Sequence, residues 1–394
     1  MRKAFINFDT TGEKNEYLKR IKTAFLDAGV EITTYFSVSC GDAVEFKRLF
    51  EYIKSGYDCI VACAGQNNTY NVKEIIADSL GVDLVESETA KERLKGKEGL
   101  DDYTEDLILL PEDATVIPND KGLVQGYMLE TDVTLIVIAD DETEGAEMLK
   151  SYVIPYLSDK LEAKLEKQHF KLFGCPKEII ADFSEKVNAV KGFKLLVTNY
   201  YGDASVTFLY PKEDEYKADE YLREMTVAFE KYAYAYDDMS LEETLVTFLK
   251  TKGLTLGTAE SFTGGGVASR IVAVSGASAV FKDGIVCYSE EAKRKRVNVS
   301  AKTLESYGAV SGDTAYEMAV GLIRGGVDFA IATTGLAGPD GDGLDNPVGR
   351  CYIAVGTRNG VFVSKHDFAG ARADVIRQGV ATALFKAVKL VKNI

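Results

Sequence analysis

The sequence predicts an α/β protein of several domains. Its 394 residues exceed the length at which a single hydrophobic core usually stops growing. In the first part of the chain, short apolar runs alternate with segments of helical periodicity, which is typical of a parallel sheet covered by helices. The last third of the chain repeats this alternation and is rich in glycine. These observations predict an α/β domain at each end of the chain and a smaller unit between them.

The first part of the chain carries four predicted strands and three predicted helices. The strands are expected at residues 3–8, 30–38, 58–64 and 133–139, and the helices at 15–28, 43–55 and 72–80. A charged helix at 155–168 then leads into a change of character. The middle of the chain reads as a helix at 177–187, a hairpin of strands 194–199 and 205–210, and a helix at 215–232. This order predicts a small α+β unit, followed by a linker at 232–240.

The last third begins with a predicted helix at 241–252. It continues with strands at 254–258, 280–288 and 328–333, helices at 263–272, 290–297 and 311–324, two strands around Arg358-Asn359-Gly360, and a closing helix at 373–392. An Asn-Gly dipeptide between apolar runs is a strong hairpin signal. We therefore predict three domains, at residues 1–158, 159–236 and 237–394.

Composition and charge narrow the class of protein. Hydrophobic residues are 46% and charged residues 27%, as in ordinary soluble proteins, and no apolar run is long enough to span a bilayer. The formal net charge of −15 would repel a polyanion, so we expect no nucleic-acid partner and no membrane partner. The N-terminus has no signal-peptide pattern, and a cytoplasmic location is expected. The six cysteines are scattered and only two histidines are present, so no structural zinc site is expected.

The segment around Ser261 has two interpretations. Ser261 lies between a predicted strand and a predicted helix, and Thr263 and glycines Gly264 and Gly265 follow it. A serine at such a turn can be a nucleophile whose oxyanion is held by amides at the helix N-terminus. Serine and threonine are also common helix caps, and the turn alone is better explained in that way.

The next strand strengthens the catalytic interpretation. It ends near Tyr288, and Lys293 follows in the next predicted helix. Because the carboxyl ends of parallel strands meet at one edge of a sheet, Ser261, Tyr288 and Lys293 can share a crevice. Without a histidine nearby, a lysine whose pKa is lowered by burial can act as the base, with the tyrosine assisting. A solvated lysine beside other basic residues is the alternative for Lys293.

Two further segments are candidates for ligand binding. The run from Thr334 through Gly335 to Gly338 follows a buried strand, and its backbone amides can approach an anion or simply form a turn. Arg372 and Arg377 lie near the start of the final helix and can bind a phosphate or remain surface charges.

Residues 240–394 resemble the C-terminal nicotinamide-nucleotide amidase domain of the CinA family. The matching segments are Ala259 to Gly265, Gly276 to Phe281, Tyr288 to Lys293, Gly308 to Ser311, Thr334 to Pro339 and Pro347 to Gly349, in the family's order. The resemblance implies hydrolysis of the carboxamide of nicotinamide mononucleotide to the acid and ammonia, in pyridine nucleotide salvage and without a cofactor.

Carried onto this chain, the resemblance implies a role for each matching residue. Ser261 would be the nucleophile, Lys293 the base and Tyr288 its assistant. Amides of residues 262–264, with the Thr263 hydroxyl, would hold the oxyanion. The nucleotide would be held by Arg372 or Arg377 and by the 334–338 loop. Relatives usually have a small residue at the position of Phe262, so this ring is expected to reshape the substrate pocket.

The resemblance extends to the rest of the chain. Residues 110–119 resemble part of the molybdopterin-binding-like N-terminal domain of CinA proteins, and Lys171 begins the stretch that corresponds to their KH-like middle domain. Active relatives have paired aspartates after the third strand, where this chain has Thr69, Tyr70 and Asn71. We therefore expect a degenerate N-terminal domain that keeps its fold, holds no divalent metal, and has lost or greatly weakened ADP-ribose pyrophosphatase activity.

Three alternatives to this function stay open. The chain could be a non-catalytic nucleotide-binding or scaffold protein, an amidase that prefers another carboxamide nucleotide, or a protein whose N-terminal domain retains pyrophosphatase activity. A homodimer is expected, and the middle unit, which lacks a G-x-x-G loop, is expected to be structural.

Overall fold

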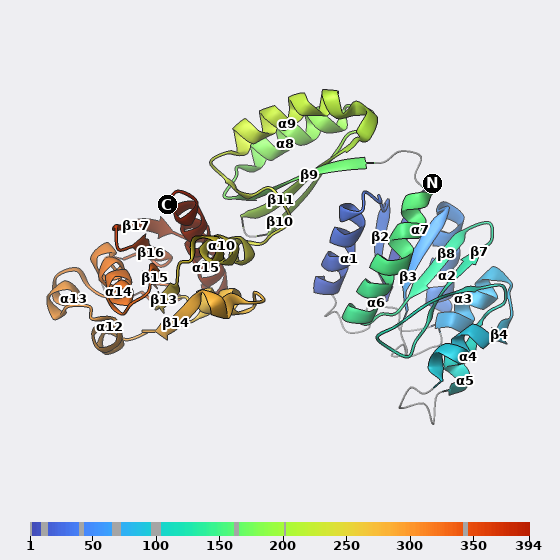
Figure 1. Cartoon of the computed structure of the whole chain (residues 1–394), viewed down its shortest axis with the longest axis horizontal. Coiled ribbons are helices and arrows are strands. Elements are labelled where there is room, and N and C mark those ends of the chain that lie inside the picture. The colour runs from blue at the N-terminus through green and yellow to red at the C-terminus, as the bar shows by residue number, and fades with distance from the viewer. Residues whose placement is uncertain are drawn as a thin grey trace. The chain divides into compact units, whose positions relative to one another are not determined.

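The computed structural model describes residues 2–8, 15–38, 43–64, 72–95, 104–160, 165–200, 202–341 and 346–394. These residues form two compact units, 1–166 and 167–394, each of which is described by itself (Figure 1). Both units combine sheets with helices, so the predicted multi-domain α/β class is confirmed. The three predicted domain ranges stay a prediction.

The first unit is built on a six-stranded sheet in the order β2-β1-β3-β8-β7-β6. The parallel part contains β1 (Lys3–Phe8), β2 (Thr34–Val38), β3 (Cys59–Cys63) and β8 (Thr134–Ile138), whereas β7 (Gly126–Glu130) and β6 (Thr115–Ile117) run antiparallel. The four predicted strands are therefore present, and β6 and β7 were not predicted. A separate two-stranded sheet pairs β4 (Leu84–Glu86) with β5 (Leu109–Pro111).

Helices cover both faces of this sheet. One apolar cluster joins the sheet to α2 (Ala43–Gly56) and α3 (Val72–Leu80) through side chains such as Phe50 and Ile76. The other joins it to α1 (Asn15–Asp27), α6 (Glu142–Met148), a π-helical turn (Leu149–Val153) and α7 (Ile154–Asp159). Two short helices, α4 (Glu88–Leu94) and α5 (Thr104–Ile108), complete the unit. The segments 9–13 and 65–71, on which the predicted loss of metal binding depends, lie outside the described residues.

The second unit begins with a four-stranded sheet in the order β10-β11-β9-β12. Its strands are β9 (Leu165–Phe173), β10 (Lys194–Tyr200), β11 (Asp203–Pro211) and β12 (Ala233–Ala235), and α8 (Lys177–Asn188) and α9 (Glu215–Phe229) pack on it. The hairpin and both helices agree with the sequence prediction. The helix predicted at 155–168 is wrong at its end, because α7 stops at Asp159 and β9 begins at Leu165. The segment predicted as a linker contains β12, which pairs with β9.

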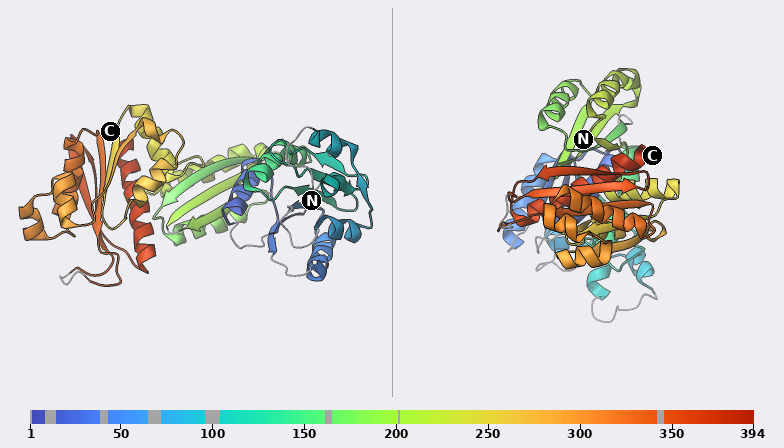
Figure 2. Two further views of the ribbon diagram at one scale, coloured as in Figure 1. Left: turned by 90° about the horizontal axis from the view of Figure 1, so that it is seen from below. Right: turned by 90° about the vertical axis from the view of Figure 1, so that its left-hand side faces the viewer.

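A five-stranded sheet in the order β14-β13-β15-β16-β17 forms the remainder of the second unit. Here β13 (Leu256–Glu260) is parallel to both β14 (Phe281–Val286) and β15 (Phe329–Gly335), and β16 (Arg350–Thr357) and β17 (Gly360–Asp367) form an antiparallel hairpin at the other side. The helices α10 (Leu241–Lys252), α11 (Gly266–Val272) and α15 (Arg372–Lys392) pack on one face. The other face carries α12 (Glu290–Val297), α13 (Ala301–Tyr307) and α14 (Gly312–Arg324), as Figure 2 shows.

The final helix also joins the two sheets of the second unit. Near its C-terminal end, the ammonium groups of Lys389 and Lys392 donate hydrogen bonds to the carbonyl oxygens of Glu230 and Tyr234, at 3.4 and 2.6 Å. The ring of Phe385 lies 5.0 Å from that of Phe173, which ends β9. No helix among the described residues is both long enough and apolar enough to cross a bilayer.

Candidate active site

Three neighbouring strands bring the candidate residues to one edge of the five-stranded sheet. Glu260, the last residue of β13, pairs with Val286 on one side and with Thr333 on the other. Because these strands are parallel, the chain leaves all three at the same edge. Ser261 follows β13 directly, and its backbone N–H donates to the carbonyl oxygen of Thr333 at 2.9 Å. The site is therefore positioned by the three neighbouring strands β14, β13 and β15.

At this edge the side chains of Ser261 and Lys293 are in direct contact. The Nζ atom of Lys293 lies 2.9 Å from the Oγ atom of Ser261, and both side chains are buried, with exposed fractions of 2% for Lys293 and 6% for Ser261. The same Nζ donates to the backbone carbonyl oxygens of Cys287 at 3.0 Å and Tyr288 at 3.4 Å. The ammonium nitrogen thus faces three oxygens.

The helix α12 directs Lys293 inward. Ser289 caps this helix by accepting a hydrogen bond from the N–H of Ala292. Val297, one turn after Lys293, is buried in the apolar cluster that includes Met318 and Leu322 on α14. Residues 294–296 between them are exposed. The alternative of a solvated lysine is therefore wrong for Lys293, whereas the basic residues 294–296 that follow it are exposed.

Burial is the main influence on the Lys293 amine. Desolvation lowers its pKa below the usual range, against small opposing effects of Cys287 and Glu290. Among the described residues, no carboxylate lies within ion-pair distance of Nζ. The lysine is therefore buried without a charged partner, and this burial allows it to lose its proton more readily than a surface lysine.

A buried carboxylate organises the turn after Ser261. Glu260 is 1% exposed, and its Oε2 accepts hydrogen bonds from the Thr263 hydroxyl at 2.7 Å and from the N–H groups of Gly265 and Val267 at 3.0 Å. Its Oε1 accepts from the N–H of Ala268 at 2.8 Å. The N-terminus of α11 is therefore occupied by a residue of the chain itself.

Two amides of this turn are the candidate donors for an oxyanion. In the part of the chain that the structure describes, no acceptor meets the N–H groups of Phe262 and Thr263, whereas the N–H of Gly264 donates to the Ser261 carbonyl at 3.1 Å. Gly264 and Gly265 both have positive φ, at 61° and 95°, which lets the chain turn sharply between strand and helix. The oxyanion donors expected at residues 262–264 are thereby narrowed to two.

The side chains of Phe262 and Thr263 are engaged in contacts within the protein and are not available to hold the oxyanion. The Thr263 hydroxyl donates to Glu260 and lies 2.7 Å from the Thr333 hydroxyl, so it belongs to a buried network. The ring of Phe262 is 3% exposed and packs in an apolar cluster with Ala337, Cys351 and Val375. The sequence leads us to expect that Phe262 reshapes the substrate pocket, but its ring is buried and is not exposed to a ligand.

Tyr288 and Arg372 form a pair at the same edge. The Tyr288 side chain is 63% exposed, and its hydroxyl accepts a hydrogen bond from Arg372 at 3.0 Å. Arg372 also donates to the carbonyl oxygen of Gly338 at 2.6 Å, in the loop after β15. The phenol of Tyr288 is thus bonded to Arg372, and the contact of Tyr288 with Lys293 runs through its backbone.

The remaining predicted residues lie near this edge or on α15. The Thr334 hydroxyl is buried and donates to the Ala309 carbonyl at 2.6 Å. Gly335 faces Cys351 so closely that a Cβ would meet the sulfur at 2.6 Å, which explains glycine there. Arg377 is exposed and forms an ion pair with Asp374 at 2.8 Å. Arg372 is therefore the predicted arginine that reaches the strand ends through a contact.

Other candidates for a base or a metal ligand lie elsewhere. His366 contacts Ser364 and stacks on Phe368, both in or next to β17, and His169 contacts Thr207 in the four-stranded sheet. Within the described ranges, no group of three or more His, Cys, Asp or Glu side chains is arranged to hold a metal ion. Lysine is therefore the base that this geometry offers to Ser261.

Known proteins resemble the chain over most of its length. A competence-damage inducible protein of Caldanaerobacter subterraneus subsp. tengcongensis is 33% identical over 87% of this chain and 86% of its own. A protein of the same name from Thermoanaerobacter sp. strain X514 is 34% identical over 90% and 89%. The CinA C-terminal domain family matches residues 238–391. The chain belongs to the CinA family. The resemblance inferred from the sequence is confirmed.

Solved structures of the CinA superfamily cover a smaller part of the chain. A superfamily protein from Klebsiella pneumoniae is 34% identical, with a TM-score of 0.38, and covers 39% of this chain and 97% of its own.

Glu260 is the site residue of the present chain that the sequence alone did not single out. A charged residue at the end of an otherwise uncharged strand, shortly before a helix start, is the signal that could have indicated it.

Proposed function

We propose that this CinA protein is an amidase that hydrolyses the carboxamide of nicotinamide mononucleotide to nicotinate mononucleotide and ammonia. The observation that carries the proposal is the 2.9 Å contact between Lys293 Nζ and Ser261 Oγ, made by a lysine that is 2% exposed. A nucleophile and a base within hydrogen-bonding reach are the core of serine hydrolase chemistry. The choice of substrate rests on the family resemblance.

The geometry suits a neutral lysine. An uncharged amine has two N–H donors and one lone pair. If the two donors are used on the carbonyl oxygens of Cys287 and Tyr288, the lone pair is directed at the Ser261 hydroxyl. Burial favours this uncharged form, because it lowers the pKa of Lys293. The hydroxyl can then donate its proton to Nζ as the oxygen attacks.

The reaction would have two stages, acylation of Ser261 and then hydrolysis of the acyl-enzyme. Ser261 Oγ bonds to the amide carbon while its proton moves to Lys293, and the oxyanion is held by the N–H groups of Phe262 and Thr263. The C–N bond then breaks, and the leaving nitrogen takes the proton from Lys293 and departs as ammonia. A water molecule, deprotonated by the neutral lysine, attacks the acyl-enzyme ester, and the Ser261 oxygen leaves with that proton. The products are the acid and ammonia, and the enzyme is restored.

Arg372 is our candidate for the phosphate of the nucleotide. It reaches the strand ends through Tyr288 and Gly338, whereas Arg377 is already paired with Asp374. A guanidinium that is bonded to a hydroxyl and a neutral carbonyl keeps its charge available for a phosphate. Tyr288 would then orient Arg372, which differs from the direct assistance to Lys293 that the resemblance implies.

Release of ammonia from nicotinamide mononucleotide tests the proposal. We expect the native chain to release ammonia, and Ser261→Ala and Lys293→Met to reduce the rate by a factor of about 10³ or more. Lys295→Met is the matched control, because Lys295 lies on the same helix, is exposed and pairs with Glu291; it should keep nearly full activity. Absence of ammonia above background from the native chain would favour a nucleotide-binding protein without catalysis.

A further inference from the structure

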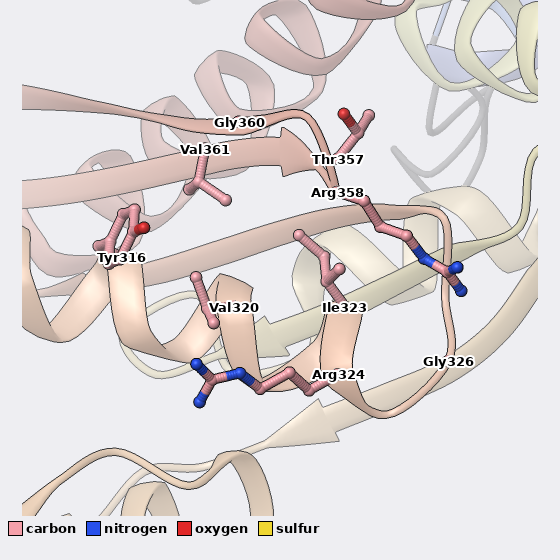
Figure 3. A pocket seen from close by; sticks show the side chains of 9 residues that line it. All are labelled: Tyr316, Val320, Ile323, Arg324, Gly326, Thr357, Arg358, Gly360 and Val361. Carbon is pink, nitrogen blue, oxygen red and sulfur yellow. The ribbon is translucent and has the colours of Figure 1, made fainter.

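A pocket lies at the opposite end of the five-stranded sheet from Ser261. It has a volume of about 530 Å³ and is formed by α14, by Gly326 after it and by the β16–β17 hairpin (Figure 3). The residues that line it are Tyr316, Val320, Ile323, Arg324, Gly326, Thr357, Arg358, Gly360 and Val361. Its volume falls within the range of small-molecule sites, which is roughly 300–1,000 Å³.

The strand register separates this pocket from the amidase site. Thr357 pairs with Phe329 at the start of β15, whereas Ser261 bonds to Thr333 near the end of that strand. Four residues of extended strand span about 13 Å. No residue of the pocket is among those assigned above to catalysis or phosphate binding. The pocket is therefore a distinct site.

The lining of the pocket is positively charged. It contains two arginines, Arg324 and Arg358, and no acidic side chain, in a chain whose net charge is −15. Within the described part of the chain, neither guanidinium has a carboxylate within ion-pair distance. Arg358 acts on Asp328 only through space, since the pKa of Asp328 is lowered first by hydrogen bonds from Thr255 and then by this arginine. Two arginines without ion pairs in one hollow favour an anionic ligand.

An adjoining acid is already engaged. Glu317 lines a smaller neighbouring hollow of about 230 Å³, which shares Tyr316, Val320 and Arg324 with the pocket. Its carboxylate accepts hydrogen bonds from the Ser300 N–H and the Thr303 hydroxyl, both at 2.7 Å. It thereby fixes the start of α13 and leaves Arg324 to the pocket.

The arrangement of the side chains indicates the shape of the ligand. Figure 3 shows the guanidinium groups of Arg324 and Arg358 pointing to opposite sides, with Ile323 between them and Val320 next to the Arg324 guanidinium. Tyr316, which is 47% exposed, offers an aromatic ring at one side. A ligand that matches this lining has an acidic group at each end and a ring or another apolar body between them.

We propose that this pocket binds a small organic dianion of that kind, and that the acid product of the amidase reaction is such a ligand. Nicotinate mononucleotide carries a carboxylate on its ring and a phosphate at the other end, whereas the carboxamide substrate carries only the phosphate. The pocket would thus discriminate product from substrate by one charge. The choice of this ligand rests on the proposed function, but the inference of a dianion site does not.

Calorimetric titration of the full chain tests the inference. The Ser261→Ala variant is titrated with nicotinate mononucleotide, with nicotinamide mononucleotide and with inorganic phosphate. We expect two binding events for the acid, and a second site that prefers the acid to the carboxamide by about tenfold or more, with affinity that falls as salt rises. The double change Arg324→Gln with Arg358→Gln should remove the second event and leave the first.

Matched variants separate the two sites. Arg223→Gln removes one positive charge from α9, where the side chain is 81% exposed and away from both sites, and should leave both events unchanged. Arg372→Gln should weaken only the first event. The inference would be overturned if Ser261→Ala shows no binding event that the double change removes, or if Arg223→Gln causes an equal loss. If ammonia is released but the second event is missing, the inference fails alone; if the second event is present without ammonia release by the native chain, the amidase proposal fails alone.

Discussion

Replacement of Glu260 by glutamine should loosen the turn that follows the nucleophile. Four donors converge on this carboxylate, three on Oε2 and one on Oε1. A glutamine retains one acceptor oxygen, and its NH₂ group must face at least one of the four donors. In the better orientation the amide nitrogen replaces Oε1, so the N–H of Ala268 loses its acceptor and the other three bonds lose a charged partner.

The size of the effect follows from these contacts. A hydrogen bond to a charged group contributes about 1.5–3 kcal/mol and a neutral one about 0.5–1.5 kcal/mol, so three weakened bonds cost about 3 kcal/mol together. An unsatisfied buried N–H costs about 1–3 kcal/mol more. The easier burial of a neutral amide offsets part of this cost. We expect a net loss of about 3–5 kcal/mol in the local stability of residues 262–268.

Hydrogen–deuterium exchange of the full chain measures this loss locally. Peptides that contain Gly265, Val267 and Ala268 should exchange about a hundredfold faster or more in Glu260→Gln. The control is Glu243→Gln, which alters the exposed capping box of α10, where glutamine can replace glutamate. Exchange within about fivefold of the native rate in Glu260→Gln would refute the account of the turn.

Three further predictions concern the site and its packing. Because burial lowers the pKa of Lys293, the amidase rate should rise with pH through a pKa below 10.5, and a flat rate profile would contradict this. The free energy of unfolding should also rise with pH between that pKa and 10.5, because in this range the unfolded chain binds a proton at Lys293 that the folded chain has lost. Arg372→Gln should raise KM for the mononucleotide about tenfold or more with a smaller change in kcat, whereas Arg377→Gln should change neither by more than about twofold. Gly379→Ala should lower thermal stability by about 1–3 kcal/mol, because its Cβ would meet the Phe262 ring at 2.4 Å, and no loss would show that the ring moves aside.

The sequence anticipated the parts of the structure that depend on local pattern. The strand-to-helix turn at Ser261 and the helix that carries Lys293 were predicted from apolar periodicity and from the convergence of parallel strands. The sequence alone does not determine the direction of the Lys293 side chain, because a lysine among other basic residues is usually exposed. Its burial follows from Val297, which anchors the same face of the helix against α14.

Tertiary contacts explain the parts that the sequence did not reveal. The segment from Leu165 reads as a continuing helix because of its lysines and glutamates, but its pairing within the four-stranded sheet makes it β9. The hydroxyl of Thr263 was expected to hold an oxyanion, and it bonds to Glu260 because that carboxylate is folded beneath the turn. Glu260 itself acquires its role only when the amides of α11 are brought to it.

The burial of Lys293 has a consequence for chemical modification. A neutral amine is the nucleophilic form of lysine, and most surface lysines are protonated at pH 7 to 8. A small acylating reagent that fits the space beside Ser261 should therefore modify Lys293 ahead of its exposed neighbour Lys295, whereas a bulky reagent should show the reverse order, because Lys293 is 2% exposed. Reagent size would thus report on the width of the path by which a ligand reaches the nucleophile.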